Sequence, residues 1–254
     1  MEGGRGKLSL VGMGISDERG ISLAGLDELC SCSRVFAENY TNIQPEGTLG
    51  RLSKLCGKGI TLLSRELVEG EREIISAAEN AWVALVVAGD PMVATTHASL
   101  VIAAKKRGME VEIFHASSIL PAAAGEAGLQ VYKFGKTTTL AYWRENYKPM
   151  AAYDAVAENV AAGLHTLLLL DIDEKLGPMK PSVAAKTLLD MEVEGRKGLF
   201  TGKTMVVLVR GIGWKGGVKK YCAISEIDDA GNGPAVLIVP GKMHFLEEEY
   251  LSAL

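Results

Sequence analysis

The sequence predicts an α/β protein with two domains. Short apolar runs of strand length alternate with stretches whose apolar residues recur at helical spacing. The length of 254 residues suits one large or two modest domains. After Phe114 the β-α repetition gives way to a stretch rich in glycine and alanine. We therefore expect an N-terminal α/β domain over residues 1–114 with a mostly parallel sheet, and a C-terminal α/β domain over residues 115–254 with a mixed sheet.

In the N-terminal domain, strands and helices are predicted to alternate with short connections. The predicted strands are 8–11, 34–37, 60–63, 82–87 and 110–114. The predicted helices are 22–31, 49–55, 69–80 and 97–106. In the first of these helices Leu23, Leu26 and Leu29 recur on one side. Because parallel strands are joined by crossovers that are usually helices, this alternation predicts a parallel sheet covered on both faces.

In the C-terminal domain, a long connection over 142–153 interrupts the regular elements. The predicted strands are 130–134, 165–172, 204–209, 219–223 and 236–239. The predicted helices are 154–162, 181–194 and 242–254. Pro181 is compatible with the second of these helices because it stands in the first turn, where a missing N–H breaks no bond.

The composition of the chain limits the partners that it is expected to bind and the compartment in which it is expected to occur. The formal charge of -4 argues against general binding to nucleic acid, which needs clustered basic residues. The apolar runs are far shorter than the ~20 residues of a membrane helix, so no membrane association is expected. The four cysteines have no CxxC spacing and no nearby histidines, so they predict no zinc site. We expect a soluble, cytoplasmic protein.

The segment AGDPMVATTHASL, residues 88–100, follows the apolar strand 82–87 directly. Gly89 has no Cβ, so the backbone there can come close to a ligand, and Asp90 offers a carboxylate. Pro91 suits the first turn after a tight bend. Thr95 and Thr96 are expected to cap the helix that begins near His97. Open α/β sheets bind ligands outside the carboxyl ends of their strands, so this segment predicts a ligand-facing edge. The alternative is a structural turn.

Two glycines also end the first strand, in Gly12-Met13-Gly14. Their amides could approach a polar or anionic ligand. The position of the third glycine in the dinucleotide fingerprint is occupied by Asp17, however, so nicotinamide binding is not expected.

Two further pairs of residues allow either a catalytic or metal-binding interpretation or a structural one. Asp90 and His97 flank one turn and could act as acid and base, but a capping role for His97 is the favoured interpretation. Asp171 and Asp173 lie at the end of the apolar strand 166–170 and could bind a metal ion. No third carboxylate or histidine is evident there, so no metal site is predicted.

Seven segments occur in an order that is specific when they are taken together. They are 12–19 (GMGISDER), 35–41 (VFAENYT), 89–97 (GDPMVATTH), 115–119 (HASSI), 131–136 (VYKFGK), 163–168 (GLHTLL) and 239–242 (VPGK). The chain thereby resembles the diphthine synthases, a branch of the tetrapyrrole methylase superfamily, from about residue 8 to residue 251.

The resemblance implies two α/β domains of the tetrapyrrole methylase type, with S-adenosyl-L-methionine in the cleft between them, and a homodimer. The cofactor would leave as S-adenosyl-L-homocysteine, and no metal is implied. The implied substrate is elongation factor 2, at a histidine that carries a 3-amino-3-carboxypropyl group. Methylation of its amine gives diphthine, on the path to diphthamide. Whether three methyl groups or an additional methyl ester form stays open, although the compact chain is more similar to archaeal members, which stop at three.

The resemblance also implies a set of cofactor-binding residues. They are Ile15, Asp90, Val93, Ser118, Ile119, Leu170, Gly211 and Ala235. The family commonly has alanine where Gly211 stands, histidine where Ala235 stands and proline where Ala88 stands. A main-chain contact at Ala235 would survive this difference, whereas a side-chain role would be lost.

Rival functions and the catalytic groups remain open on the sequence alone. A precorrin methyltransferase of the same superfamily, a non-catalytic cofactor-binding protein and a dinucleotide oxidoreductase are the alternatives. An α-amino group has a pKa of ~8, so part of it is neutral near pH 7 and no general base is assigned. Tyr132, Tyr142 and Trp143 could stabilise a methylated cation, but core packing or loop anchoring is the favoured interpretation.

Overall fold

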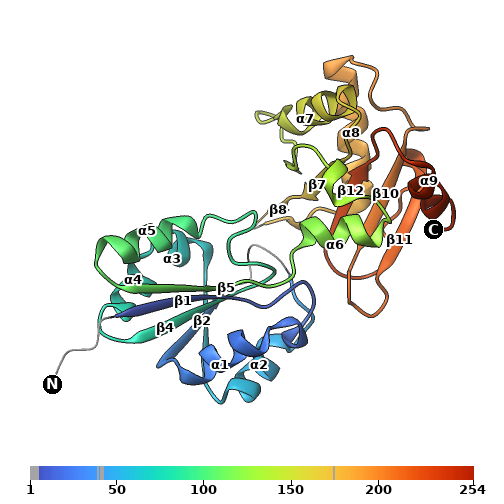
Figure 1. Cartoon of the computed structure of the whole chain (residues 1–254). Coiled ribbons are helices and arrows are strands. Elements are labelled where there is room, and N and C mark those ends of the chain that lie inside the picture. Colours follow the sequence, from blue (N-terminus) through green and yellow to red (C-terminus); the bar gives the residue numbers. More distant parts are fainter. Residues whose placement is uncertain (1–5, 39, 41–42, 174) are drawn as a thin grey trace. The chain divides into compact units, whose positions relative to one another are not determined.

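The computed structural model describes residues 6–38, 40, 43–173 and 175–254. The chain divides after Ile119 into two compact units (Figure 1). This division lies five residues beyond the predicted boundary at 114. His115 and Ala116 belong to the first unit because both donate hydrogen bonds to Asp90. Two residues of the sequence segment 35–41, Asn39 and Thr41, lie outside the described residues.

The first unit is built on a five-stranded sheet in the order β3-β2-β4-β1-β5. Its strands are β1 (Lys7–Gly12), β2 (Arg34–Glu38), β3 (Ile60–Leu63), β4 (Trp82–Val87) and β5 (Glu110–Phe114). Every pairing in this sheet is parallel. The predicted α/β class and parallel sheet are therefore confirmed.

Helices cover both faces of this sheet (Figure 1). They are α1 (Leu23–Ser31), α2 (Thr48–Cys56), α3 (Arg65–Glu69), α4 (Arg72–Ala78) and α5 (Ala98–Lys106). Leu29 of α1 and Leu52 of α2 pack with one set of strand side chains, including Val86. Ile74 of α4 and Leu100 of α5 pack with the alternate set. Both faces are thus buried, as a parallel sheet requires.

Two local predictions in this unit are wrong. The helix predicted over 69–80 is shorter and spans Arg72–Ala78, because Glu71 before it adopts a left-handed φ of 59°, and the short helix Arg65–Glu69 was not predicted. The predicted caps Thr95 and Thr96 are not the N-cap of α5, which is His97 without a side-chain cap bond. The Thr95 hydroxyl instead donates to the Pro91 carbonyl at 3.0 Å.

The second unit contains a mixed five-stranded sheet in the order β11-β10-β12-β7-β6. Its strands are β6 (Thr138–Leu140), β7 (Thr166–Leu170), β10 (Met205–Arg210), β11 (Val218–Ala223) and β12 (Ala235–Val239). β6 runs parallel to β7, and the other pairs are antiparallel. A separate ribbon pairs β8 (Ile172–Asp173) with β9 (Gly177–Pro178).

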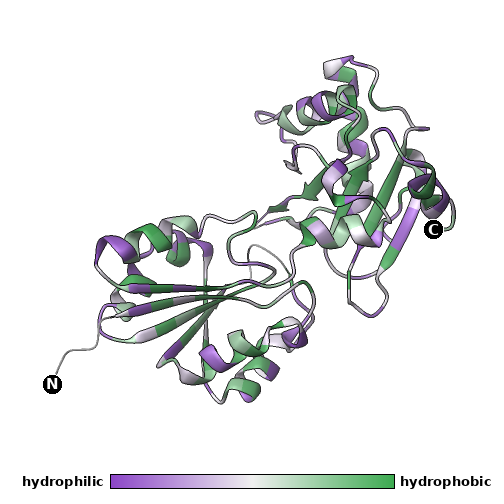
Figure 2. Cartoon of the chain, in the orientation of Figure 1, coloured by the Kyte–Doolittle hydropathy of each residue, from purple (hydrophilic) through white to green (hydrophobic). Residues whose placement is uncertain are grey.

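Four longer helices accompany this sheet. They are α6 (Ile119–Glu126), α7 (Ala151–Ala161), α8 (Pro181–Gly195) and α9 (Phe245–Ser252). Tyr153 of α7 and Leu188 of α8 share one core with Leu208 and Leu237 of the central strands. Figure 2 shows these central strands as apolar, whereas the edge strand β11 carries Lys219 and Lys220.

The strand predicted over 130–134 is wrong. Residues Val131–Lys133 form a short 3-10 helix, and only an isolated bridge joins Phe134 to His165 beside β7. The strand predicted over 165–172 is divided, because β7 ends at Leu170 and β8 begins at Ile172. The last predicted helix is shorter than expected and spans Phe245–Ser252.

Two absences concern the described part of the chain. None of its helices combines the length and apolar character needed to cross a membrane. All four cysteines are free thiols; Cys30 is exposed and the other three are buried.

Candidate functional site

The predicted site residues of the first unit gather at one edge of its sheet. Ile15 follows β1, Asp90 and Val93 follow β4, and Ser118 and Ile119 follow β5. These three strands are neighbours in the order β4-β1-β5 and are parallel, so their carboxyl ends meet at the same edge. This is the edge at which open α/β sheets bind ligands.

Glycines bring the loops at this edge into direct contact. Gly14 and Gly89 exchange two backbone hydrogen bonds, at 3.2 and 2.8 Å, and both have left-handed φ values, of 78° and 74°. A Cβ on Gly12 would lie 2.7 Å from the Gly89 carbonyl oxygen and 2.8 Å from the Ala116 Cβ. A Cβ on Gly89 would meet no heavy atom within 4 Å. The loops are therefore packed on each other, while Gly89 borders open space.

The Asp90 carboxylate ties two of these loops together. Its side chain is 6% exposed. Oδ1 accepts the Met92 N–H at 2.9 Å, and Oδ2 accepts the Ala116 N–H at 3.2 Å and the His115 Nδ1–H at 2.8 Å. Burial alone would raise the pKa of Asp90, but these donors outweigh it and hold the pKa below its usual value. Asp90 is thus an anion that orients the chain after β4 and β5.

Sequence reasoning missed His115, the side-chain partner of this carboxylate. Its imidazole is 68% exposed although it is held by a buried anion. The signal was available, because His115 is the first residue after the predicted strand 110–114, at a carboxyl strand end.

His97 does not form the acid–base pair with Asp90 that was considered. The hydrogen-bonding partner of the Asp90 side chain is His115, whereas His97 Nδ1 lies 2.9 Å from the carbonyl oxygen of Pro91. His97 is 1% exposed, and its Nε2 has no hydrogen-bond partner among the described residues. The imidazole therefore fastens the loop of residues 91–97 from inside the unit.

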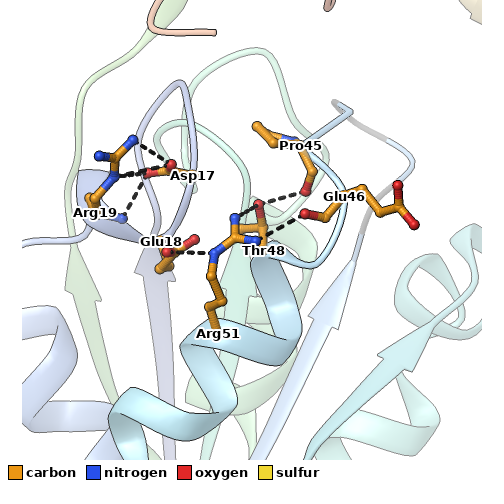
Figure 3. Close-up of polar contacts among 7 residues, drawn as sticks. All are labelled: Asp17, Glu18, Arg19, Pro45, Glu46, Thr48 and Arg51. Atoms are coloured by element: carbon orange, nitrogen blue, oxygen red, sulfur yellow. Dashed lines mark hydrogen bonds and ion pairs between the residues drawn. The ribbon is translucent and has the colours of Figure 1, made fainter. Parts of the chain in front are cut away.

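The loop after β1 explains why the dinucleotide fingerprint stops at Asp17. Asp17 caps the short helix Glu18–Gly20 by accepting the Arg19 N–H at 3.1 Å, and its carboxylate pairs with the Arg19 guanidinium at 2.7 Å (Figure 3). The buried Glu18 pairs with Arg51 of α2 at 2.8 Å, and Arg51 also donates to the Thr48 hydroxyl at 3.2 Å. Charged side chains thus fix a loop that a third glycine would leave open.

The predicted site residues of the second unit also gather at one edge of their sheet. Leu170 ends β7, Gly211 directly follows β10, and Ala235 begins β12, which lies between those two strands. Ala235 is paired with Arg210, the residue before Gly211. Gly211 has a left-handed φ of 61°, and a Cβ there would collide with the Asn232 carbonyl. Alanine in place of Gly211 would therefore strain this loop.

The acidic pair after β7 is engaged by its own unit. Asp171 accepts the Tyr142 N–H at 3.0 Å. Asp173 accepts the Lys175 and Leu176 N–H groups, both at 2.9 Å, and pairs with Arg144. Across the described ranges, no group of three or more histidine, cysteine or acidic residues has the arrangement of a metal site.

The three aromatic candidates differ in their surroundings. Tyr142 and Trp143 are partly buried and pack against the core of the second unit. The Trp143 indole N–H donates to the Pro149 carbonyl at 3.2 Å, and Lys148 lies 5.3 Å from its ring centroid. Tyr132 is 78% exposed. Tyr142 and Trp143 thus serve packing and loop anchoring.

Comparison with known proteins places these observations in a family. The sequence profile of the Tetrapyrrole (Corrin/Porphyrin) Methylases matches residues 7–227. A diphthine synthase of Methanothermobacter thermautotrophicus is 37% identical, over 96% of this chain and 94% of that protein. A diphthine methyl ester synthase of Schizosaccharomyces pombe is 38% identical, over 96% of this chain and 93% of that protein. A crystal structure of diphthine synthase superposes with a TM-score of 0.87 at 29% identity, over 97% of this chain and 95% of that chain.

Proposed function

The chain belongs to the diphthine synthases within the tetrapyrrole methylase family, and we propose that it methylates the 3-amino-3-carboxypropyl-histidine of elongation factor 2, with S-adenosyl-L-methionine as donor. The product of this reaction is diphthine, on the path to diphthamide. The observation that carries the proposal is the match in sequence and fold over nearly the whole chain.

The residues present are compatible with the donor. We assign its contacts in the first unit to Ile15, Asp90, Val93, Ser118 and Ile119, at the edge where Gly89 borders open space. Because the Asp90 oxygens are engaged by N–H groups of its own unit, we assign its contact with the donor to the main chain. In the second unit we assign contacts to Leu170, Gly211 and Ala235, the last of them through its backbone.

The donor supplies a methyl group on an activated sulfonium. The protein then has to align the amine of the substrate, shield it from water and keep it neutral. An amine with a pKa of ~8 is about one-tenth neutral at pH 7, and an apolar pocket increases that share because it disfavours the ammonium form.

Mass spectrometry of the aminocarboxypropylated elongation factor tests the proposal. Incubation with the enzyme and the donor should add increments of one methyl group at the modified histidine. A methyl group that mild alkali removes is bound as a methyl ester. This treatment therefore distinguishes the two activities named among the relatives, diphthine synthase and diphthine methyl ester synthase. Elongation factor without the aminocarboxypropyl group serves as the control. The absence of any increment on the modified factor would contradict the proposal.

Three rival functions, the last of them a dinucleotide oxidoreductase, predict different results in parallel experiments. A precorrin methyltransferase would transfer labelled methyl to a precorrin and not to the elongation factor. A binding protein without catalysis would bind the donor in calorimetry but release no S-adenosyl-L-homocysteine. NAD should not raise the thermal stability of the protein, whereas S-adenosyl-L-methionine should.

Three further properties implied by the family remain proposals. The chain is proposed to act as a homodimer, which light scattering of the purified protein tests. It is proposed to need no metal, so activity should survive treatment with a chelator and dialysis. A cytoplasmic location is proposed, which microscopy of a tagged chain tests.

A further inference from the structure

The hydrogen bond between Asp90 and His115 fixes the tautomer of the imidazole. Asp90 is a carboxylate with a lowered pKa, so it only accepts hydrogen bonds. The His115 Nδ1, 2.8 Å from Asp90 Oδ2, must therefore carry the proton. In the neutral imidazole, Nε2 then holds a lone pair. The His115 side chain is 68% exposed, whereas that of Asp90 is 6% exposed. The buried carboxylate of Asp90 thus holds an imidazole that is accessible to solvent.

The other histidines of the chain have different surroundings. His97 is buried together with its Nε2. His165 is fully buried and uses both nitrogens: Nδ1 accepts the Gly241 N–H at 2.9 Å, and Nε2 lies 3.3 Å from Glu247. His244 is exposed, but its ring accepts the Leu246 N–H at the start of α9. His115 therefore combines an exposed ring with a carboxylate that orients it.

The position of His115 relates it to the proposed reaction. It follows β5 directly and lies three residues before Ser118, one of the proposed donor contacts. Its anchor, Asp90, is another proposed contact and follows β4. The imidazole is consequently held at the carboxyl edge where the donor is proposed to bind.

We propose that His115 Nε2 accepts the proton that the substrate ammonium must lose before each methyl transfer, and that Asp90 is the positioning residue for this imidazole. The inference rests on the proposed function. The N–H bond of the ammonium breaks and its proton moves to Nε2. The freed nitrogen lone pair then forms the N–C bond as the C–S bond breaks with its electron pair going to sulfur. The imidazolium releases its proton to water before the next cycle.

The surroundings of His115 suit this role. Asp90 accepts the Nδ1–H of the ring and thereby leaves Nε2 as the nitrogen that takes up the proton. The nearest ionisable residue on its own strand, Glu112, pairs with Lys7 of the adjacent β1 at 2.6 Å. Histidine is the side chain whose charge change lies closest to neutral pH, which matches a substrate amine that is mostly protonated there.

The role of His115 recurs at each methyl transfer. The product of the first transfer is again an ammonium, which must lose a proton before the second transfer, and the same holds before the third. Three transfers thus release three protons, whereas the final trimethylammonium needs no further deprotonation. Loss of the acceptor should therefore slow every one of these transfers.

The test compares single-turnover rates of the wild type and His115→Asn between pH 6.5 and 9. Asparagine keeps an N–H near the position of Nδ1, so it can still bond to Asp90, but it has no group at Nε2. We expect the rate at pH 6.5 to fall by about 100-fold, the lower end of the range for general base catalysis. At pH 9 the deficit should shrink to below about tenfold, because an amine of pKa ~8 is then mostly neutral.

Two controls separate this role from a structural one. His244→Asn makes the same substitution at an exposed histidine, where asparagine can still cap α9, and should keep the wild-type pH profile. Imidazole added to His115→Ala should restore part of the rate at pH 6.5. The affinity of His115→Asn for S-adenosyl-L-methionine, measured by calorimetry, should stay within about twofold of wild type, because the donor keeps its contacts.

The outcomes distinguish failure of the inference from failure of the proposed function. An active wild type together with a His115→Asn rate that is unchanged, or lowered equally at every pH, would overturn the inference alone. Loss of donor binding in His115→Asn would likewise assign a structural role and overturn it. A wild type that transfers no methyl group to the aminocarboxypropylated factor at any pH would overturn the proposed function, and the inference with it.

Discussion

Glu247 of α9 is a buried carboxylate surrounded by donors, and its neutralisation should destabilise the second unit. Its side chain is 1% exposed. It accepts backbone N–H groups of Gln130 at 3.0 Å and His244 at 2.7 Å, and it contacts the Lys133 ammonium and the His165 imidazole. Burial alone would raise the pKa of Glu247, but these donors together lower it to about 2.

The lowered pKa sets the size and the pH range of the effect. A drop from 4.5 to about 2 corresponds to roughly 3.4 kcal/mol of stability. Because the folded-state pKa is depressed, this stability is fully present above pH 4.5 and is lost as the pH falls toward 2. At pH 3 the same relation leaves roughly 1.4 kcal/mol.

The perturbation is Glu247→Gln, which keeps the shape of the side chain and removes its charge. The amide NH₂ would then face donors, so the free energy of unfolding at pH 7 should fall by about 3 kcal/mol. Urea unfolding of the wild type and the variant at pH 7 and pH 3 measures the difference. Subtracting the variant removes the titration of other carboxylates, and Glu248→Gln on the same helix is the exposed control.

Two results would refute this reasoning about Glu247. One is a difference between wild type and Glu247→Gln of less than about 1 kcal/mol at pH 7, well below the 3–5 kcal/mol typical of a broken buried pair. The other is a difference that is the same at pH 7 and pH 3, since the linkage requires the charged form to carry the effect.

Three further substitutions test the packing of the two units. Gly12→Ala would place a Cβ 2.7 Å from the Gly89 carbonyl oxygen, so donor affinity in calorimetry should fall by at least tenfold; an unchanged affinity would contradict the proposed site at this edge. Tyr153→Phe removes a buried hydroxyl that donates to Glu192 at 2.9 Å, and urea unfolding should show a loss of about 1–3 kcal/mol rather than none. Gly211→Ala forces alanine into a left-handed φ of 61° against a backbone carbonyl, so the melting temperature without donor should drop by several degrees, and an unchanged value would show that the loop relaxes.

The fold class was predictable because the apolar residues within a single strand indicate which of its two faces are buried. In β4 the residues Val83, Leu85 and Val87 pack on one face while Ala84 and Val86 pack on the other. Such a continuous apolar run is typical of a strand covered on both sides, and hence of a parallel sheet with helices on both faces. The local sequence was sufficient here because each apolar side chain indicates that the face of the strand on which it lies is buried.

Two segments were assigned wrongly because tertiary contacts or single backbone conformations decide them. The strand expected over 130–134 has apolar residues of suitable type, but backbone bonds join it to β7 only around one bridge, at Phe134. The helix expected over 69–80 begins only at Arg72, because Glu71 has a positive φ. The spacing of apolar residues does not reveal a single residue whose backbone adopts a positive φ.

The site was predictable as a location but not as a hydrogen-bond network. Asp90 could be placed at a carboxyl strand end from its own segment. Its contact with His115, 25 positions later, depends on how β4 and β5 are arranged beside β1. The order of strands in a parallel sheet is not encoded in any short segment, so the pairing of the carboxylate with the imidazole required the structure.

The place of β1 between β4 and β5 has a consequence for how the chain is made. Lys7 pairs with Trp82 and Glu110, so β1 has to wait for two neighbours that are synthesised after it. At a synthesis rate of about 5–20 residues per second, the 75 positions between Lys7 and Trp82 correspond to a delay of roughly 4–15 s. During that interval the apolar segment of β1 lacks both of the strands with which it pairs in the sheet.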